Sequence, residues 1–285
     1  MAMQAMTGAL IWWNARKRTP LDMRSICRFV VAALLLLSVA PVTRASAQDL
    51  FEIQVYPYDT VEPGITMLEF HTNFIPSGTK TAAEPGVLAN NQQFHVTMEV
   101  THGFTKHFET GFYLETAPYV PNEGAKFVGW HVRPRFSLPE FKSFPFHFSL
   151  SLEYAFNRPD FDPNGQTLEI RPIFERERGR LYLSINPSMS VAVKGPDAGS
   201  APGFGPSVKV GWDFSKKVAG GVEYYSETGT VKHFEPWAAQ HHILFSAADL
   251  NVSPDWELNF GLGRGLTGTS EHWIVKSIVG YRFKH

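Results

Sequence analysis

Residues 146–154, FHFSLSLEY, set the fold class that this sequence predicts. An aromatic or leucine side chain stands at every even-numbered position of this stretch, and histidine, serine or glutamate stands between them. Successive side chains of a β-strand point to opposite faces, so a period of two gives the strand one apolar and one polar face. The stretch therefore predicts a strand at the boundary between an apolar and a polar environment.

The same alternation recurs along the chain after residue 64, and no segment has a convincing helical period. It predicts strands at 68–74, 94–101, 108–115, 128–136, 146–154, 168–175, 181–193, 207–214, 218–225, 243–250, 256–262 and 273–283. Joins after even-numbered strands are mostly short, whereas joins after odd-numbered strands are longer and richer in Gly, Pro and Asn. We therefore expect an all-β fold over residues 65–285: a transmembrane antiparallel β-barrel of about 12 strands, with short periplasmic turns, longer extracellular loops and both termini in the periplasm.

A soluble β-sandwich is the alternative fold, because its strands also alternate. The barrel is favoured because the polar face is rich in Glu, Arg and His but poor in Lys, and because aromatic residues gather near the strand ends, where barrels carry girdles. Four prolines fall inside predicted strands: Pro134, Pro172, Pro187 and Pro206. Proline cannot donate a ladder hydrogen bond, so we expect bulges or local breaks at these positions.

The N-terminal region has the pattern of an export signal. Residues 29–40, FVVAALLLLSVA, are apolar but too short to cross a bilayer as a helix, which argues against the alternative of a membrane anchor. Arginines precede this run, and the small residues Ala45 and Ala47 follow it in the pattern that signal peptidase accepts. We expect residues 1–47 to be a signal peptide cleaved before Gln48, with Met23 as an alternative start.

Removal of residues 1–47 leaves a chain that differs in charge and in cysteine content. Six basic residues and one acidic residue are lost, so 26−6 = 20 basic and 27−1 = 26 acidic residues remain, with a formal charge of −6. This acidic balance argues against nucleic acid as a partner. The single cysteine, Cys27, is also lost, which excludes disulfides and thiolate metal sites. Residues 48–64 are polar and contain proline, and we expect them to form a periplasmic N-terminal lead-in.

Two segments resemble those of known outer-membrane proteins. Residues 279–283, VGYRF, resemble the aromatic C-terminal signature that the barrel-assembly machinery recognises, with Tyr281 and Phe283 as its aromatic residues, although Lys284 and His285 follow. Residues 101–111, THGFTKHFETG, resemble the turn-and-strand units of barrels of the MetA-pathway-of-phenol-degradation type, which are described as transporters. The resemblance implies a porin-like barrel in the outer membrane of a Gram-negative envelope, with lipid, lipopolysaccharide and the assembly machinery as partners.

In a barrel the polar face points into the lumen, which predicts a charged interior. The most specific feature is a group of arginines, Arg133, Arg135 and Arg171, on strands that run in the same direction. We expect these side chains at similar depth, because only one strand separates the two that carry them. Arginine binds carboxylates with two parallel hydrogen bonds, and the nearest carboxylates are expected to be Glu109, Glu115, Glu169 and Glu175.

A second group joins two neighbouring strands: His71 and His95 face inward near Glu69 and Glu99. This pattern is compatible with a metal or an acid–base site. Lumen ion pairs are the favoured explanation, so we expect no metal and no other cofactor.

These features favour a passive channel or transporter for small molecules whose charged Glu, Arg and His lumen selects the solute, which the sequence leaves unspecified. The alternatives are a hydrolase sited at the rim of the barrel and a non-conducting structural barrel. The expected loops contain possible rim residues, namely His233, Glu235, His241, Ser270, Glu271 and His272. They form no recognisable catalytic motif, and we therefore expect no enzyme activity.

Overall fold

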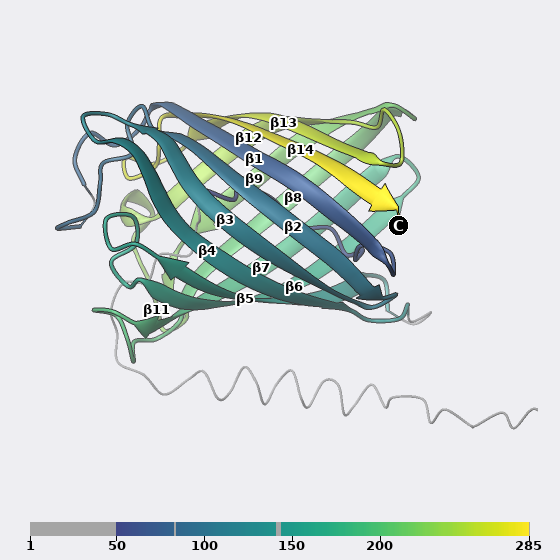
Figure 1. Cartoon of the computed structure of the whole chain (residues 1–285), viewed down its shortest axis with the longest axis horizontal. Helices are drawn as coiled ribbons and strands as arrows, with labels where there is room; N and C mark the ends of the chain where they lie inside the picture. Colours follow the sequence, from purple (N-terminus) through teal and green to yellow (C-terminus); the bar gives the residue numbers. More distant parts are fainter. Residues whose placement is uncertain (1–49, 83, 141–143, 285) are drawn as a thin grey trace, which may run out of the picture. The chain divides into compact units, whose positions relative to one another are not determined.

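The computed structural model describes residues 50–82, 84–140 and 144–284, and it has the β-barrel fold that the sequence predicts (Figure 1). The expected signal peptide and its cleavage site at Ala45, Ala47 and Gln48 lie outside the described residues. The long strands are β1 (Ile65–Ser77), β2 (Phe94–Thr105), β3 (Phe108–Val120), β4 (Gly124–Ser137), β5 (His147–Asn157), β6 (Gln166–Arg178), β7 (Leu181–Lys194), β8 (Gly203–Ser215), β9 (Val218–Glu227), β12 (His241–Leu250), β13 (Trp256–Gly265) and β14 (Trp273–Lys284). Two short strands, β10 (Gly229–Thr230) and β11 (His233–Phe234), and a 3-10 turn, η1 (Trp237–Ala239), lie between β9 and β12.

The twelve long strands close into a barrel in which every pairing is antiparallel. Neighbours in sequence pair from β1 to β9 and from β12 to β14, and the β9–β12 and β1–β14 pairs complete the circle. Each sequence-predicted segment corresponds to one of these strands, and most of the strands extend a few residues beyond the predicted ends. The antiparallel barrel of about 12 strands is therefore confirmed.

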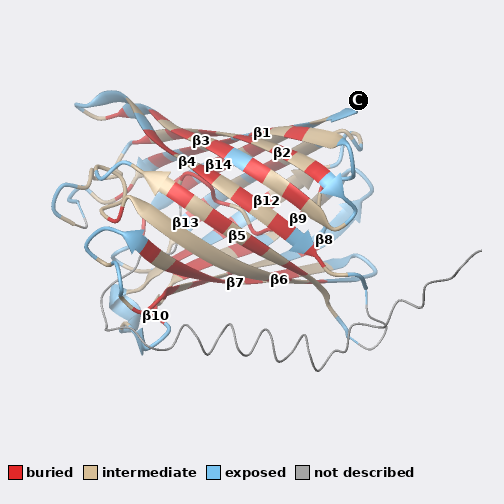
Figure 2. Cartoon of the chain, turned by 60° about the horizontal axis from the view of Figure 1, so that its bottom comes forward, coloured by how far each residue is buried: buried red, intermediate tan, exposed pale blue. Residues whose placement is uncertain are grey.

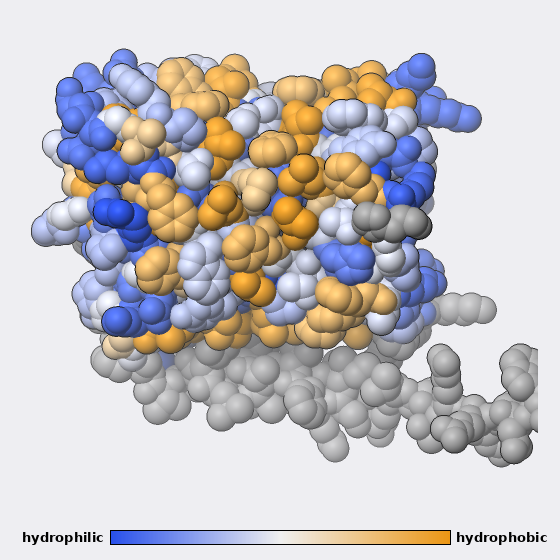
Figure 3. Space-filling view, in the orientation of Figure 1, coloured by the Kyte–Doolittle hydropathy of each residue, from blue (hydrophilic) through white to orange (hydrophobic). Residues whose placement is uncertain are grey.

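The two faces of the wall carry opposite kinds of side chain. Figure 2 shows buried residues alternating with less buried ones along the strands. The exposed positions include large apolar side chains on many strands, and Figure 3 shows apolar side chains across the middle of the molecule with hydrophilic ones gathered toward its two ends. Most of the buried positions carry polar or charged groups. This is the pattern of a wall between lipid and a polar interior. Among the described residues, no helix is long and apolar enough to cross a membrane.

The connections differ between the two ends of the barrel. At the end where the C-terminus is marked in Figure 1, hereafter the turn end, two-residue turns join β2 to β3, β6 to β7 and β8 to β9. The opposite end, hereafter the loop end, carries the longer joins 78–93, 228–240 and 266–272. One join differs from the sequence prediction: β3 and β4 extend into the expected long loop 118–126, and three residues remain between them.

Three of the four prolines lie in gaps of a ladder whose register does not shift across the gap. Pro172 and Pro187 lie in a gap of the β6–β7 ladder, which resumes in the same register beyond the gap. Pro134 lies in a similar gap between β4 and β5, and Pro206 is paired with Pro187 across β7 and β8. The expected local breaks are thus present at Pro134, Pro172 and Pro187, whereas the β7–β8 ladder runs without a break past Pro206. The register shifts of the described strands lie at other positions, so these prolines form no bulges.

Residues 50–64, hereafter the N-terminal segment, lie inside the barrel. Leu50 and Phe51 accept hydrogen bonds from Asn73 near the loop end of β1, whereas Gly64 donates to Gly103 at the turn end of β2. The segment therefore runs through the interior from the loop end to the turn end before β1 begins. The expected lead-in outside the barrel is therefore not what residues 50–64 form, and residues 48 and 49 lie outside the described part of the chain.

Two apolar clusters fix the first half of the segment. Ile53 and Val55 pack with Ile75, Tyr225, Ile243, Phe245 and Ile274 of the wall. Phe51 packs with Ala117, Val120 and Val128. Burial of isoleucine or phenylalanine contributes about 1.5–3 kcal/mol per side chain, so these contacts favour the segment inside the barrel.

Candidate functional site: the barrel interior and its N-terminal segment

Side chains of the wall bind the backbone of the N-terminal segment. The Tyr56 N–H donates to Asn186 Oδ1 (2.6 Å), and the Tyr58 N–H donates to Glu175 Oε2 (2.8 Å). The Val61 N–H donates to Glu109 Oε2 (2.6 Å). These acceptors lie on β7, β6 and β3, which places the segment in contact with strands from different parts of the wall.

The wall also supplies donors for the carbonyl groups of the segment. Thr97 Oγ1 donates to the Phe51 carbonyl (3.0 Å), Lys276 Nζ to the Ile53 carbonyl (3.0 Å) and Ser184 Oγ to the Tyr56 carbonyl (2.8 Å). A backbone buried without partners would cost several kcal/mol, so these bonds allow an extended chain to stay inside the barrel.

Gly103 provides the space for the last part of the segment. A Cβ atom at this position would lie 2.2 Å from the Val61 carbonyl oxygen and 2.3 Å from the Glu62 carbonyl oxygen. Both contacts are with backbone, which cannot swing aside as a long side chain can. The close approach of the segment to β2 therefore requires glycine at this position.

The three arginines that the sequence singled out surround one tyrosine of the segment. The guanidinium carbons of Arg133, Arg171 and Arg135 lie 4.3, 4.6 and 5.7 Å from the centre of the Tyr56 ring. The Tyr56 hydroxyl also lies 3.2 Å from that of Tyr113. Guanidinium groups within about 6 Å of an aromatic ring are attracted to its face.

Each of these arginines also has a carboxylate partner. Arg133 lies 2.6 Å from Glu99 and 3.7 Å from Glu109. Arg135 lies 2.7 Å from Glu109 and donates to the Pro57 and Asp59 carbonyls, and Arg171 lies 2.6 Å from Glu169.

The other two expected carboxylates have different partners. Glu115 lies 3.2 Å from His131, and Glu175 accepts from Tyr58 and from the Tyr182 hydroxyl. The sequence prediction thus holds for Glu109 and Glu169 as arginine partners and fails for Glu115 and Glu175. The reason is that pairing distance depends on the depth of each side chain as well as on its strand.

The predicted histidine group is divided in the structure. His71 Nε2 lies 3.2 Å from Glu99 Oε2, and Glu69 lies opposite Glu99 across the β1–β2 ladder. His95 is nearer the loop end, where its ring stacks on Phe51 at 3.9 Å and its nitrogens face Leu50 and Gln93. The two histidines therefore belong to separate contacts, one within the wall and one with the N-terminal segment.

A second charged cluster was not singled out by the sequence. Lys276 forms an ion pair with Glu223, and Lys209 lies 3.3 Å from Glu223 and 2.9 Å from Asp249. Lys276 is almost fully buried and also donates to Ile53 of the segment. Sequence spacing gives little sign of this cluster, because its residues come from four strands: β8, β9, β12 and β14.

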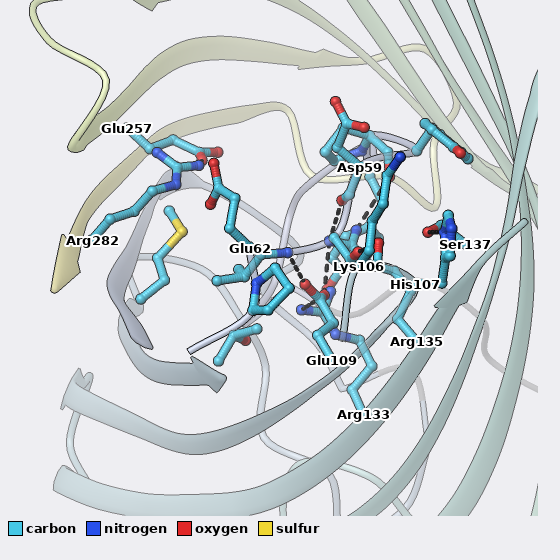
Figure 4. Close-up of a pocket in the computed structure, with 18 of the residues that line it drawn as sticks. Asp59, Glu62, Lys106, His107, Glu109, Arg133, Arg135, Ser137, Glu257 and Arg282 are labelled. Carbon is cyan, nitrogen blue, oxygen red and sulfur yellow. Dashed lines mark hydrogen bonds and ion pairs between the residues drawn. The ribbon is translucent and has the colours of Figure 1, made fainter. Parts of the chain in front are cut away.

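A cavity of about 680 Å³ remains at the turn end (Figure 4). The N-terminal segment forms one side of it, with Asp59 and Glu62, and the wall contributes Glu109, Arg133 and Arg135. Lys106, His107, Ser137, Glu257 and Arg282 also line it. This part of the interior is polar and carries charges of both signs.

The loop end carries a separate charged contact. His241 Nε2 lies 2.5 Å from Glu271 Oε2, and Asn90 donates to the other oxygen of Glu271 (2.5 Å). Burial alone would raise the pKa of the Glu271 carboxyl, but the charge and hydrogen bond of His241 outweigh burial and hold that pKa below its usual value. The contact joins the loops 78–93 and 266–272 to the start of β12.

The candidate rim residues do not assemble a nucleophile with a base. Ser270 Oγ accepts from the His242 backbone N–H (2.8 Å) and lies 2.6 Å from Thr267 Oγ1. His242 is stacked on Trp237, with its ring nitrogens facing Tyr224 and Gln240. A catalytic serine needs a base within hydrogen-bond reach, and within the described part of the chain neither the His242 backbone nor the Thr267 hydroxyl supplies one to Ser270.

The aromatic residues of the expected assembly signal lie on the outer face of β14. Tyr281 and Phe283 are exposed, and their rings pack together at 4.9 Å. Tyr281 also packs on Trp256 of β13 at 5.0 Å. Their role in assembly stays a prediction.

Sequence reasoning missed Ile53 and Tyr56 because it treated the N-terminal segment as a linker. A signal was present: Phe51, Ile53 and Val55 alternate with polar residues in the same period as the strands. The nearby prolines are typical of segments without regular secondary structure, and they favoured the prediction of a lead-in over that of a packed segment.

A scan against protein-family models gives no match, and neither does a search of curated proteins. Among solved structures, the chain is similar to the COG4313 outer membrane channel from Pseudomonas putida F1, with a TM-score of 0.57 and 10% sequence identity over 81% of this chain and 100% of that one. It is also similar to the NanC porin, with a TM-score of 0.50 and 8% identity over 76% of this chain and 100% of that one. At such low identity the likeness extends to the fold, and that fold is the one used by outer-membrane channels.

Proposed function

We propose that this protein is an outer-membrane channel for small molecules, and that its own N-terminal segment controls the passage. Two observations support the channel part: the barrel has the fold of the COG4313 channel and of the NanC porin, and it has an apolar outer face around a polar interior. The resemblance of residues 101–111 to MetA-pathway barrels agrees with this proposal and leaves the solute open.

The path of the N-terminal segment carries the second part of the proposal. The segment crosses the interior and is held by apolar packing at the loop end and by hydrogen bonds farther along. It belongs to no strand of the wall, so it can leave the interior while the twelve-stranded ladder stays intact. A state with the segment withdrawn would have a wider lumen.

The charged groups of the interior would then face the solute. Arg133 and Arg171 now lie against the Tyr56 ring, and departure of that ring would expose one face of each guanidinium. Carboxylates such as Glu99 and Glu109 would remain beside them. We infer that this mixed ring of charges sets which small molecules pass, as charged rings do in other pores.

Conductance in planar bilayers tests the proposal. A variant that lacks residues 48–58 should conduct in a stable manner, whereas the full-length protein should be closed for most of the time. Circular dichroism would verify that the variant keeps its β-structure. If the folded variant is silent, the channel proposal is wrong and the alternative of a non-conducting structural barrel is supported.

A further inference from the structure

We infer that the barrel interior contains a binding site for a divalent transition-metal ion such as Zn²⁺, formed by Glu52, His131 and Glu153, which would join the N-terminal segment to the wall. Glu52 lies on the segment, His131 on β4 and Glu153 on β5. Each offers a ligand atom, and these three atoms lie within 4.8 Å of one another. This inference goes beyond the proposed channel function, because metal binding can be measured without conductance.

The burial of these ligands sets them apart from an ordinary acidic surface. Glu52 is 5% exposed, His131 1% and Glu153 8%. Glu52 Oε1 is buried and has no hydrogen-bond partner among the residues that the structure describes. A buried carboxylate oxygen without a partner is costly, and a bound cation would satisfy it.

The two nitrogens of His131 suit a metal ligand. Nδ1 lies 3.0 Å from Glu153 Oε1, on the side of the proposed ion. Nε2 lies 3.2 Å from Glu115 Oε2, which can accept its proton. Histidine ligands commonly donate their second N–H to a carboxylate or carbonyl, which fixes the tautomer and the ring orientation.

The local charge also favours a cation. The carboxylates of Glu52, Glu115 and Glu153 surround one imidazole. The two guanidinium groups nearby already have carboxylate partners: Arg133 lies 2.6 Å from Glu99, and Arg171 lies 2.6 Å from Glu169. One imidazole and two carboxylates are a donor set that Zn²⁺ accepts, with water completing the coordination. The absence of thiolate and the presence of imidazole argue for this class of ion over Cu⁺ and over Mg²⁺.

A second group of similar composition provides a matched control. Glu69, His71 and Glu99 also offer three ligand atoms within 4.8 Å. Glu99, however, lies 2.6 Å from the Arg133 guanidinium and accepts from Thr101, so its charge is already balanced and a cation would meet the arginine. We expect no metal at this second group.

Equilibrium dialysis against Zn²⁺ tests the site in full-length protein that has been freed of metal with a chelator and refolded in the presence of Zn²⁺. We expect one tightly bound ion per chain, lost in Glu52→Gln and in His131→Gln, and retained in the control His71→Gln. Glu115→Gln, which replaces the charged acceptor of the Nε2 proton with a neutral amide, should weaken binding by about 10- to 100-fold. Circular dichroism verifies folding, and Glu52→Gln leaves every strand residue unchanged.

Two results would overturn the inference. The first is wild-type protein that binds no Zn²⁺ in stoichiometric amount. The second is folded Glu52→Gln and His131→Gln protein with wild-type affinity. If the His131 variant fails to fold, the wild-type protein alone still tests the inference. Co²⁺ bound at the site should give visible ligand-field absorption, and added Zn²⁺ should abolish it. Absence of these bands would contradict the presence of a metal site.

Discussion

Truncation of Ile53 should release the N-terminal segment without unfolding the barrel. This side chain is 2% exposed and packs against wall residues of β1, β9, β12 and β14. Replacing a buried isoleucine by alanine costs roughly 2–5 kcal/mol. Because Ile53 would be in water when the segment is withdrawn, most of this cost falls on the docked state of the segment and little falls on the strands.

The expected change in opening follows from that cost. Each 1.4 kcal/mol changes an equilibrium about tenfold, so Ile53→Ala should raise the ratio of withdrawn to docked segment by roughly 30-fold to a few thousand-fold. The measurement is the fraction of time that a single channel is open in a planar bilayer. The variant without residues 48–58 provides the fully open reference.

The control is Val252→Ala, which makes the same kind of truncation at an exposed position in the turn between β12 and β13. It should leave the open fraction unchanged. If Ile53→Ala stays within about twofold of the wild type while the deletion variant conducts, the packing of Ile53 does not hold the segment and the argument from buried area is refuted.

Four further predictions concern the wall, the interior and the loop end. Leu152 lies at the centre of β5 and faces outward, so Leu152→Lys should lower the free energy of unfolding in lipid by about 2–4 kcal/mol. Phe136→Lys, near the end of a strand, should lower it by about 0–1 kcal/mol. Equal losses of free energy in refolding titrations would mean that Leu152 does not face the membrane core. Arg133→Ala leaves the buried carboxylate of Glu99 without the guanidinium that lies 2.6 Å from it, so it should destabilise the full-length protein by about 3–5 kcal/mol. In the variant without residues 48–58 it should shift ion selectivity toward cations, and an unchanged reversal potential together with an unchanged melting temperature would place Arg133 outside the lumen. Gly103→Val should displace the Val61–Glu62 backbone and raise the open fraction, whereas Gly268→Val, with open space around it, should not. An unchanged open fraction in Gly103→Val would show that this close contact does not hold the segment. The pKa of the Glu271 carboxyl is lowered in the folded protein, so its stabilising contribution should be complete above about pH 5 and be lost as the pH falls below about 4. The difference in unfolding free energy between the wild type and Glu271→Gln should therefore shrink between pH 7 and pH 3. A difference that stays constant over this range would count against the pair with His241.

The wall of the barrel was predictable because one physical contrast acts along its whole length. Each strand separates lipid from a polar interior, so the period of two appears in every strand and fixes its face. Segment 146–154 illustrates this, since Ser149 and Ser151 are buried inside whereas Leu150 and Leu152 face outward. Strand ends were less predictable, as at β3 and β4, where pairing between the strands extends the ladder into residues that appeared to form a loop.

The arginine group was predictable in part for a related reason. Strand direction and spacing place Arg133, Arg135 and Arg171 at similar depth, and the structure brings all three to Tyr56. The partners of individual carboxylates depend on rotamers and on depth, which the alternation does not contain. Glu115 therefore meets His131, and Glu175 meets the Tyr58 backbone, at positions where the sequence suggested arginine.

The position of the N-terminal segment inside the barrel was not predicted, because its backbone forms hydrogen bonds with side chains of the wall and not with a neighbouring strand. Its acceptors at Asn186, Glu175 and Glu109 lie 130, 117 and 48 residues away in sequence from the N–H groups that they bind. No local pattern of residues 50–64 records such partners. The sequence of the wall does indicate that such partners exist. Its inner face carries more amides, carboxylates and hydroxyls than its ion pairs use, and buried groups of this kind require hydrogen-bond partners. A narrow barrel whose inner face is rich in such groups is therefore better predicted as a filled barrel than as an empty one, and the alternating run at Phe51, Ile53 and Val55 is the part of this chain that fits the space.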